Sequence, residues 1–197
     1  MIRDAAIAIP KPRLNYCVSP SLKLFNQSVQ KFLSDHEQFD GVCTGALIYD
    51  NLHRILLIQR AASDSWPGRW EIPGGSCEDA DDTILDGLVR EVWEETGLIV
   101  KAIIRLVNDF GTQFLSRSGK RIIKFEFEIE VEHTGLVQLN KEEHEAFVWA
   151  TEEECEAGRI KGHSNTSFEF TTSSQSESIM EAFRFRRLKQ KEILSSS

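Results

Sequence analysis

The sequence has no apolar run long enough to cross a membrane, and no cysteine pair at the short spacing of a zinc knuckle or a redox dithiol. Its four cysteines are widely separated, so we expect reduced thiols rather than disulfides: Cys17, Cys43, Cys77 and Cys155. The N-terminal Ala-Ile run is too short and too interrupted for a secretory signal. We therefore expect a soluble protein without membrane partners in the cytoplasm, with the nucleus not excluded.

Positive charge is scarce. The 23 Lys and Arg residues face 31 Asp and Glu residues, which gives a formal net charge of −8. Such a surface repels nucleic acid as a whole, so a polyanionic substrate would need local help, for which a metal ion is suited. The apolar fraction of 41% over 197 residues is enough for one globular domain. The composition leaves a homodimer open.

The order of patterns along the chain favours an α/β domain. We expect an N-terminal extension over residues 1–39 with one helix at 21–36, followed by the main domain over 40–197. Apolar alternation predicts strands at 41–50, 54–60, 99–110, 121–131 and 146–150. Helical patterns are predicted at 80–96, where Gly97 ends the helix, at 151–158 and at 178–194, with a loop or lid over 161–178.

One predicted helix concentrates acidic residues. With 3.6 residues per turn, the helix over 80–96 carries four charged residues on one side: Arg90, Glu91, Glu94 and Glu95. Apolar residues cover the flank and the opposite side. Neighbouring carboxylates raise one another's pKa unless a cation neutralises them, and one arginine cannot balance three glutamates. Mg²⁺ can, because it prefers hard oxygen ligands, although such clusters are more often solvated helix faces.

The segment over residues 74–98 resembles the signature of the Nudix hydrolase family. That signature reads Gly, five residues, Glu, seven residues, Arg-Glu, an aliphatic residue, any residue, Glu-Glu, any residue, Gly and an aliphatic residue. Residues 90–98 match its second half at every position. The resemblance covers roughly residues 40–155. It implies an α/β/α sandwich with a mixed β-sheet, in which the acidic helix is the catalytic helix.

The first half of the signature departs from the family pattern. Seven residues before Arg90 lies Asp82 rather than Glu, and six residues rather than five separate Asp82 from Gly75. Asp81 would restore the five-residue spacing but break the seven-residue spacing. We interpret Asp82 as standing in place of the Glu, with one residue inserted in the loop before the helix, where an insertion costs little.

The resemblance also implies a mechanism. In this family a water attacks phosphorus in a diphosphate linked to another group, and divalent ions bind the helix glutamates. Carried over, it implies Mg²⁺, or Mn²⁺ in its place, held by Glu91, Glu94, Glu95 and the carbonyl of Gly74 or Gly75. Glu91 and Glu94 take the catalytic roles, with Glu91 a metal ligand or the base, and Arg90 orients the carboxylates. The metal neutralises charge on phosphate oxygens while a carboxylate takes the proton.

Three residues outside the helix complete the predicted site. Family members often recruit a glutamate from a later loop, and we prefer Glu143 for this role, although a solvated turn is an equally common origin of such residues. Trp70 and Phe110 are candidates for stacking a nucleotide base, although such aromatics more often anchor a core or a loop. His144 is a weaker candidate for a catalytic base.

Two absences bear on the substrate. All five prolines lie at or before Pro73, and both tyrosines, Tyr16 and Tyr49, precede the signature. Family subclasses for ADP-ribose and for dinucleoside polyphosphates usually carry a proline or a tyrosine shortly after it, so both are disfavoured. We expect a hydrolase that cleaves a phosphoanhydride bond in a nucleoside di- or triphosphate. The alternative is a nucleotide-binding or regulatory module of the same fold without turnover, suggested by Asp82 and the insertion.

Overall fold

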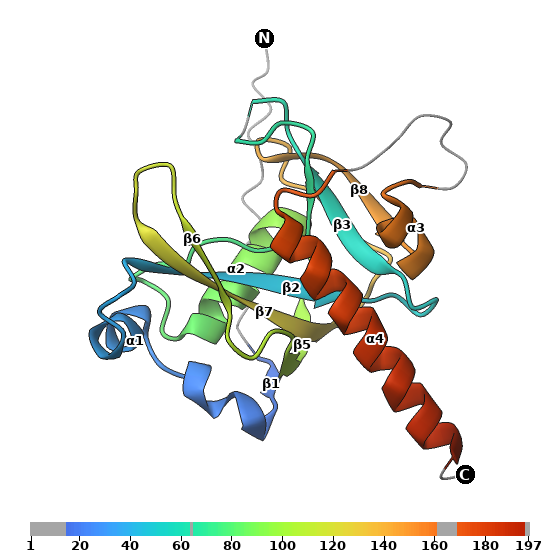
Figure 1. The fold of residues 1–197 in the computed structure, drawn as a ribbon, viewed down its shortest axis with the longest axis horizontal. Coiled ribbons are helices and arrows are strands. Elements are labelled where there is room, and N and C mark those ends of the chain that lie inside the picture. The colour runs from blue at the N-terminus through green and yellow to red at the C-terminus, as the bar shows by residue number, and fades with distance from the viewer. Residues whose placement is uncertain (1–14, 64, 161–168, 196–197) are drawn as a thin grey trace, which may run out of the picture.

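The computed structural model describes residues 15–63, 65–160 and 169–195, and two β-sheets form its centre (Figure 1). One sheet has the order β1-β5-β7-β2, with β6 also paired to β7, and the other has the order β4-β3-β8. The first sheet comprises β1 Cys17–Val18, β2 Gly41–Ile48, β5 Val100–Leu106, β6 Thr112–Leu115 and β7 Arg121–Val131. The second comprises β3 Ile55–Arg60, β4 Trp70–Glu71 and β8 His144–Ala150. The helices are η1 Pro20–Phe25, α1 Val29–Asp35, α2 Ile84–Thr96, α3 Glu152–Ala157 and α4 Ser173–Ser195.

The first sheet is mixed, as the resemblance implied. β2 pairs with β7 in parallel, whereas β5 and β6 pair with β7 antiparallel. The turn over 50–53 joins β2 to β3, and these strands belong to different sheets that share one isolated bridge, Tyr49 to Ile55. The predicted strands are therefore confirmed as strands, with bounds that shift by a few residues. β6 is an additional strand that the patterns did not indicate.

Helices cover both faces of the strands, so the α/β/α sandwich is confirmed. Successive residues of a strand point to opposite faces. On β2, Ala46 and Ile48 pack in the core that contains the apolar stripe of α2, whereas Leu47 packs in a second core with Ile179 and Phe183 of α4. In Figure 1, α4 crosses in front of the strands and α2 lies behind them.

The N-terminal part of the described chain belongs to the α2 side of this sandwich. The predicted single helix over 21–36 is wrong, because η1 and α1 are two short helices separated at residues 26–28. The hydroxyl of Ser28 accepts from the amide of Lys31 and caps α1. The ring of Phe25 packs edge-on against Phe125 and Phe127, with centroids 4.8 and 5.0 Å away. Residues outside the predicted main domain thus contribute to its core.

The helix predicted over 80–96 is confirmed with a later start. α2 begins at Ile84, and Thr83 is its N-cap, accepting from the amide of Asp86 at 3.0 Å. The predicted first residues instead form a turn in which Asp81 accepts from the amide of Glu78. Gly97, with a φ of 67°, ends the helix in the left-handed conformation that favours glycine.

The C-terminal predictions are confirmed in kind. α3 carries the capping box of Thr151 and Glu154. α4 begins at Ser173, so the part of the predicted loop or lid over 173–178 is wrong, while 161–168 lies outside the described residues. Among the described residues, no helix is both long and apolar enough to span a bilayer.

Candidate functional site

The site begins at the glycine turn between β4 and α2. The carbonyls of Pro73 and Gly75 accept from the amides of Ala46 and Thr44 on β2, so the turn lies directly against that strand. Gly74 has a φ of 142°, and a Cβ there would lie 2.3 Å from the carbonyl oxygen of Thr44. Only glycine fits this approach. Within the described ranges the Gly74 carbonyl accepts no hydrogen bond, which leaves it available to a cation.

Arg90 ties the turn to the helix. Its guanidinium, 6% exposed, donates to both carboxylate oxygens of Asp81 at 2.9 and 3.0 Å and to the carbonyl of Ser76 at 2.8 Å. It also donates to Glu91 and Glu94, each at 2.9 Å. Burial alone would lower the pKa of Arg90, but the bonds to Asp81 and the charge of Glu91 raise it overall. All five N–H groups are engaged, which leaves none for a substrate.

The aspartate that meets Arg90 is Asp81, not Asp82. Asp81 is buried, whereas Asp82 is exposed and precedes the helix cap. The five-residue spacing from Gly75 is therefore kept, and the inserted residue lies between Asp81 and the helix. Gly87 permits this contact, because a Cβ there would lie 2.8 Å from Oδ2 of Asp81. The interpretation that placed Asp82 in the role of the family's Glu is corrected.

The three helix glutamates differ in burial. The side chains of Glu95, Glu91 and Glu94 are 6%, 14% and 43% exposed. Burial raises the pKa of Glu91 and raises that of Glu95 well above its ordinary value. The carboxylate of Glu91 lies against Gly75, where a Cβ would approach it to 2.7 Å. Carboxylates that are buried without enough positive charge fit a site that a divalent cation completes.

Glu143 joins this site from the loop before β8. Ligand atoms of Glu95, Glu143 and His144 lie within 4.8 Å of one another. Burial is the largest cause of the raised pKa of both Glu91 and Glu95, and the negative charge of Glu143 is a smaller one. Two of these three donors are carboxylates, which suit Mg²⁺ or Mn²⁺. Glu91 and Glu94 lie next to this group on the helix and are not part of it in this structure.

Motif reasoning did not select Glu71 and Arg60, and it gave His144 little weight. Nε2 of His144 lies 3.2 Å from Glu71, which forms an ion pair with Arg60 at 2.5 Å. Two signals were present in the sequence. Glu71 is a charged residue in the apolar segment directly before the glycine turn, and His144 follows Glu143. Their meeting depends on the pairing of β3 with β4 and β8, which spacing does not give.

The two predicted base-stacking residues have different environments. Trp70 is 4% exposed in the α4-side core, so neither ring face is open to a base. The structure thus gives Trp70 a packing role. Phe110 is 85% exposed between β5 and β6. Its contact with a nucleotide stays a prediction.

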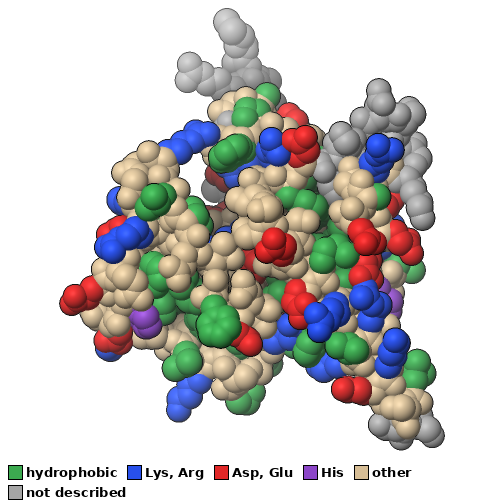
Figure 2. All heavy atoms as spheres, in the orientation of Figure 1, with side chains coloured by type: hydrophobic (Ala, Val, Ile, Leu, Met, Phe, Trp, Pro, Cys, Tyr) green, Lys and Arg blue, Asp and Glu red, His purple; other side chains and the backbone are tan. Residues whose placement is uncertain are grey.

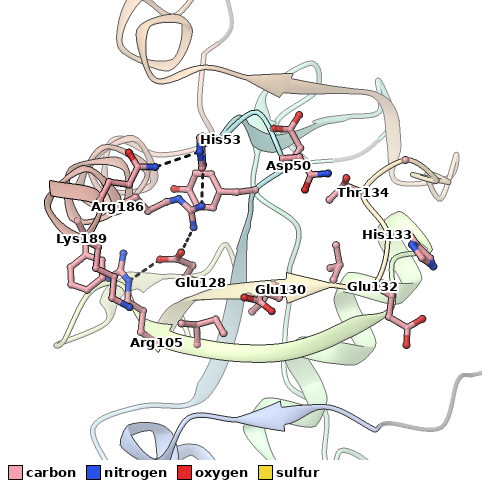
Figure 3. A pocket seen from close by; sticks show the side chains of 18 of the residues that line it. Asp50, His53, Arg105, Glu128, Glu130, Glu132, His133, Thr134, Arg186 and Lys189 are labelled. Atoms are coloured by element: carbon pink, nitrogen blue, oxygen red, sulfur yellow. Dashed lines mark hydrogen bonds and ion pairs between the residues drawn. The ribbon is translucent and has the colours of Figure 1, made fainter. Parts of the chain in front are cut away.

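A cavity of about 1150 Å³ lies elsewhere, between the C-terminal half of α4, β5, β7 and the turn after β2 (Figure 3). It contains none of the predicted site residues. Glu128 bonds to both Arg105 and Arg186 there, and the two guanidinium groups stack on Phe185 and Tyr49. These cations hold α4 to the sheet. On the face in Figure 2, Lys and Arg side chains gather beside α4 among acidic ones.

Comparisons with known proteins agree with the resemblance seen in the sequence. A family model described as "NUDIX domain" matches residues 40–171. A MutT-like protein of Streptomyces ambofaciens is 36% identical over 51% of this chain and 57% of its own length. The CTP pyrophosphohydrolase of Escherichia coli K12 is 33% identical over 56% of this chain and 76% of its own. The chain therefore matches little more than half of the first relative.

The fold has solved counterparts as well. A crystal structure of a MutT protein from Methanosarcina mazei Go1 superposes with a TM-score of 0.56 at 23% identity. The superposition covers 75% of this chain and 94% of that one. At this identity the likeness concerns the fold alone.

Proposed function

This chain belongs to the Nudix family, and on that basis we propose that it is a divalent-metal-dependent hydrolase of phosphoanhydride bonds in nucleoside di- or triphosphates. One observation carries the proposal. The buried carboxylate of Glu95 meets Glu143 and His144, Glu91 lies beside them against the glycine turn, and Arg90 holds the helix and the turn together. This arrangement concentrates negative charge where a cation can bind and attract a diphosphate.

The positions of the residues support the following proposed roles. Bound Mg²⁺, or Mn²⁺ in its place, would neutralise negative charge on the phosphate oxygens. Glu95, Glu143 and the carbonyl of Gly74 are the oxygen donors that would hold it, with Glu94 at the exposed edge. Glu91 takes the proton of the attacking water as the new bond to phosphorus forms and the anhydride P–O bond breaks. In the metal-free protein, burial raises the pKa of this carboxylate.

A nucleoside triphosphate is the favoured substrate. The relative from Escherichia coli is a CTP pyrophosphohydrolase, and this chain matches 76% of its length. Attack at the α-phosphorus would release pyrophosphate and leave a nucleoside monophosphate. Phe110, exposed between β5 and β6, is the remaining aromatic candidate for the base.

The main reason for the alternative, a binding module without turnover, does not hold. That alternative rested on Asp82 and on the inserted residue. Because Asp81 makes the buried ion pair with Arg90, the insertion leaves the support of the helix carboxylates intact. We therefore favour the enzyme.

A substrate screen tests the proposal. The full chain is incubated with nucleoside di- and triphosphates and Mg²⁺ or Mn²⁺, and released phosphate or pyrophosphate is measured. We expect turnover that falls at least about 100-fold in Glu91→Gln and Glu95→Gln. Glu132→Gln, the same change at an exposed position, should retain activity. If no nucleotide is hydrolysed above the Glu95→Gln background, the enzyme assignment is wrong.

A further inference from the structure

A chain of polar contacts between Arg60, Glu71 and His144 lies behind Glu95. Nε2 of His144 lies 3.2 Å from Oε1 of Glu71 and 3.7 Å from Oε1 of Glu95. The same oxygen of Glu71 accepts from Arg60 at 2.5 Å. Arg60 in turn donates to the carbonyl and the hydroxyl of Ser65. This row of contacts therefore runs from Arg60 through Glu71 and His144 to the edge of the carboxylate site.

The small sheet brings these residues together. Arg60, the last residue of β3, stands opposite His144, the first residue of β8, and the β3–β8 register shifts between Gln59 and Arg60. Glu71 lies on β4, on the other side of β3, opposite Ile58. The ends of these three strands thus place the guanidinium of Arg60 and the imidazole of His144 around the buried carboxylate of Glu71.

Glu71 orients the imidazole. His144 is 1% exposed, and among the described residues its Nδ1 has no hydrogen-bond partner. Nε2 faces two carboxylates, so we assign the ring proton to Nε2, which donates to Glu71. The contact with Glu95 is too long for a hydrogen bond, and the dipole of the same N–H attracts this second carboxylate. Because the ring is held through Nε2, the ion pair of Glu71 with Arg60 determines where that N–H lies.

The N–H of His144 separates two like charges. Glu71 and Glu95 are both buried carboxylates, and Oε1 of each lies near Nε2 of this ring. Oε2 of Glu95 is held by the amide of Gly74 at 2.7 Å, so its other oxygen faces His144. Without the imidazole, the buried carboxylates of Glu71 and Glu95 would face each other, and their repulsion would turn Glu95 away.

We propose that His144 is a positioning residue for the metal site: held by the Glu71–Arg60 ion pair, it keeps the carboxylate of Glu95 in place for a divalent cation. The proposal rests on the proposed function in one respect, that Glu95 is a metal ligand. His144 itself does not touch the metal. Groups that orient a ligand in this way commonly alter metal affinity about 10- to 100-fold when they are removed.

Metal binding without nucleotide tests this role. Free Mn²⁺ is measured by electron paramagnetic resonance during titration of the full chain and three variants. His144→Leu removes the donor, His144→Gln keeps one, and Glu71→Gln removes the charge that orients the ring. We expect Mn²⁺ affinity to fall about 10- to 100-fold in His144→Leu and about tenfold in Glu71→Gln, with His144→Gln close to wild type. The double variant His144→Leu, Glu71→Gln should lose no more than His144→Leu alone, since both act in one row.

Glu128→Gln is the matched control. Glu128 is also a buried glutamate between two cationic partners, Arg105 and Arg186, but it lies at the α4 cavity. We expect this variant to lose stability in thermal unfolding and to keep the Mn²⁺ affinity of the wild type. If Glu71→Gln behaves like Glu128→Gln, the row is only structural and the proposal is wrong.

The outcomes separate this proposal from the proposed function. If the wild type binds no Mn²⁺, the metal-dependent function is wrong. If it binds Mn²⁺, the positioning role is wrong when Glu71→Gln does not weaken binding and His144→Gln does not retain it. This test holds even if His144→Leu fails to fold. Pulsed resonance spectra that show a nitrogen bound directly to Mn²⁺ would also overturn it, because His144 would then be a ligand.

Discussion

At the residue scale, Asp81 and Asp82 show how neighbouring residues of the same kind can have different roles. Asp81 is the buried partner of Arg90, and Asp82 is exposed. We expect Asp81→Ala to lower the free energy of unfolding by about 3–5 kcal/mol, because it leaves a buried guanidinium without its main partner. Asp82→Ala should change it by less than about 0.5 kcal/mol. Urea unfolding of both variants measures the difference, and equal effects would contradict the assignment.

Glu95 predicts a pH dependence for the metal-free protein. Its pKa is raised in the folded state, so the folded protein binds this proton more tightly than the unfolded chain does. Between about pH 4.3, the ordinary value for glutamate, and the raised value, stability therefore falls as pH rises. In EDTA, the urea midpoint should decrease from about pH 5 upward.

Glu95→Gln supplies the control for this titration. The variant cannot lose the proton, so its urea midpoint in EDTA should vary less with pH than that of the wild type. Glu91, whose pKa is also raised by burial, contributes to the slope that remains. Identical slopes in the two proteins would show that Glu95 does not cause the dependence.

At the element scale, the N-terminal helices test where the folded unit begins. The family model starts at residue 40, yet Phe25 of η1 packs against two phenylalanines of β7. We expect Phe25→Ala to destabilise the whole domain by about 3–5 kcal/mol, as truncation of a buried aromatic does. Leu24→Ala, at a neighbouring side chain that is 77% exposed, is the control. Loss of stability only in the N-terminal segment would identify it as a separate extension.

The kind of most elements was predictable, and their limits were not. The alternation in β7 and the apolar stripe of α2 are local signals, and they can be recognised even when the predicted bounds are shifted by a few residues. The start of α2 depends on Thr83 as its cap and on the turn that Asp81 closes, and both compete with a pattern that looks helical from residue 80. α4 likewise begins before its predicted start, within a stretch of polar residues. Burial of the later α4 residues in the second core offsets the weak helical pattern of that stretch.

At the scale of the whole molecule, the strands need cover on both faces. Residues such as Leu47, Ile55 and Leu57 are fully buried in the core that α4 completes. A chain that ends at Thr172 should therefore lose its cooperative thermal transition and bind a dye for exposed apolar surface. A chain that ends at Lys191 should keep the transition, because the buried residues Ile179 and Phe183 remain. Cooperative unfolding of the shorter chain would show that α4 is dispensable.

The sequence by itself determined the sandwich of helices and strands, the acidic helix and its family, because these depend on periodicity and on spacing within one segment. It also indicated Glu143, which the structure brings beside Glu95. Only the tertiary structure decided that Asp81 meets Arg90 and that Glu71 and His144 lie behind Glu95. These contacts join segments whose distance is set by loop paths and strand register, and local patterns do not contain that information.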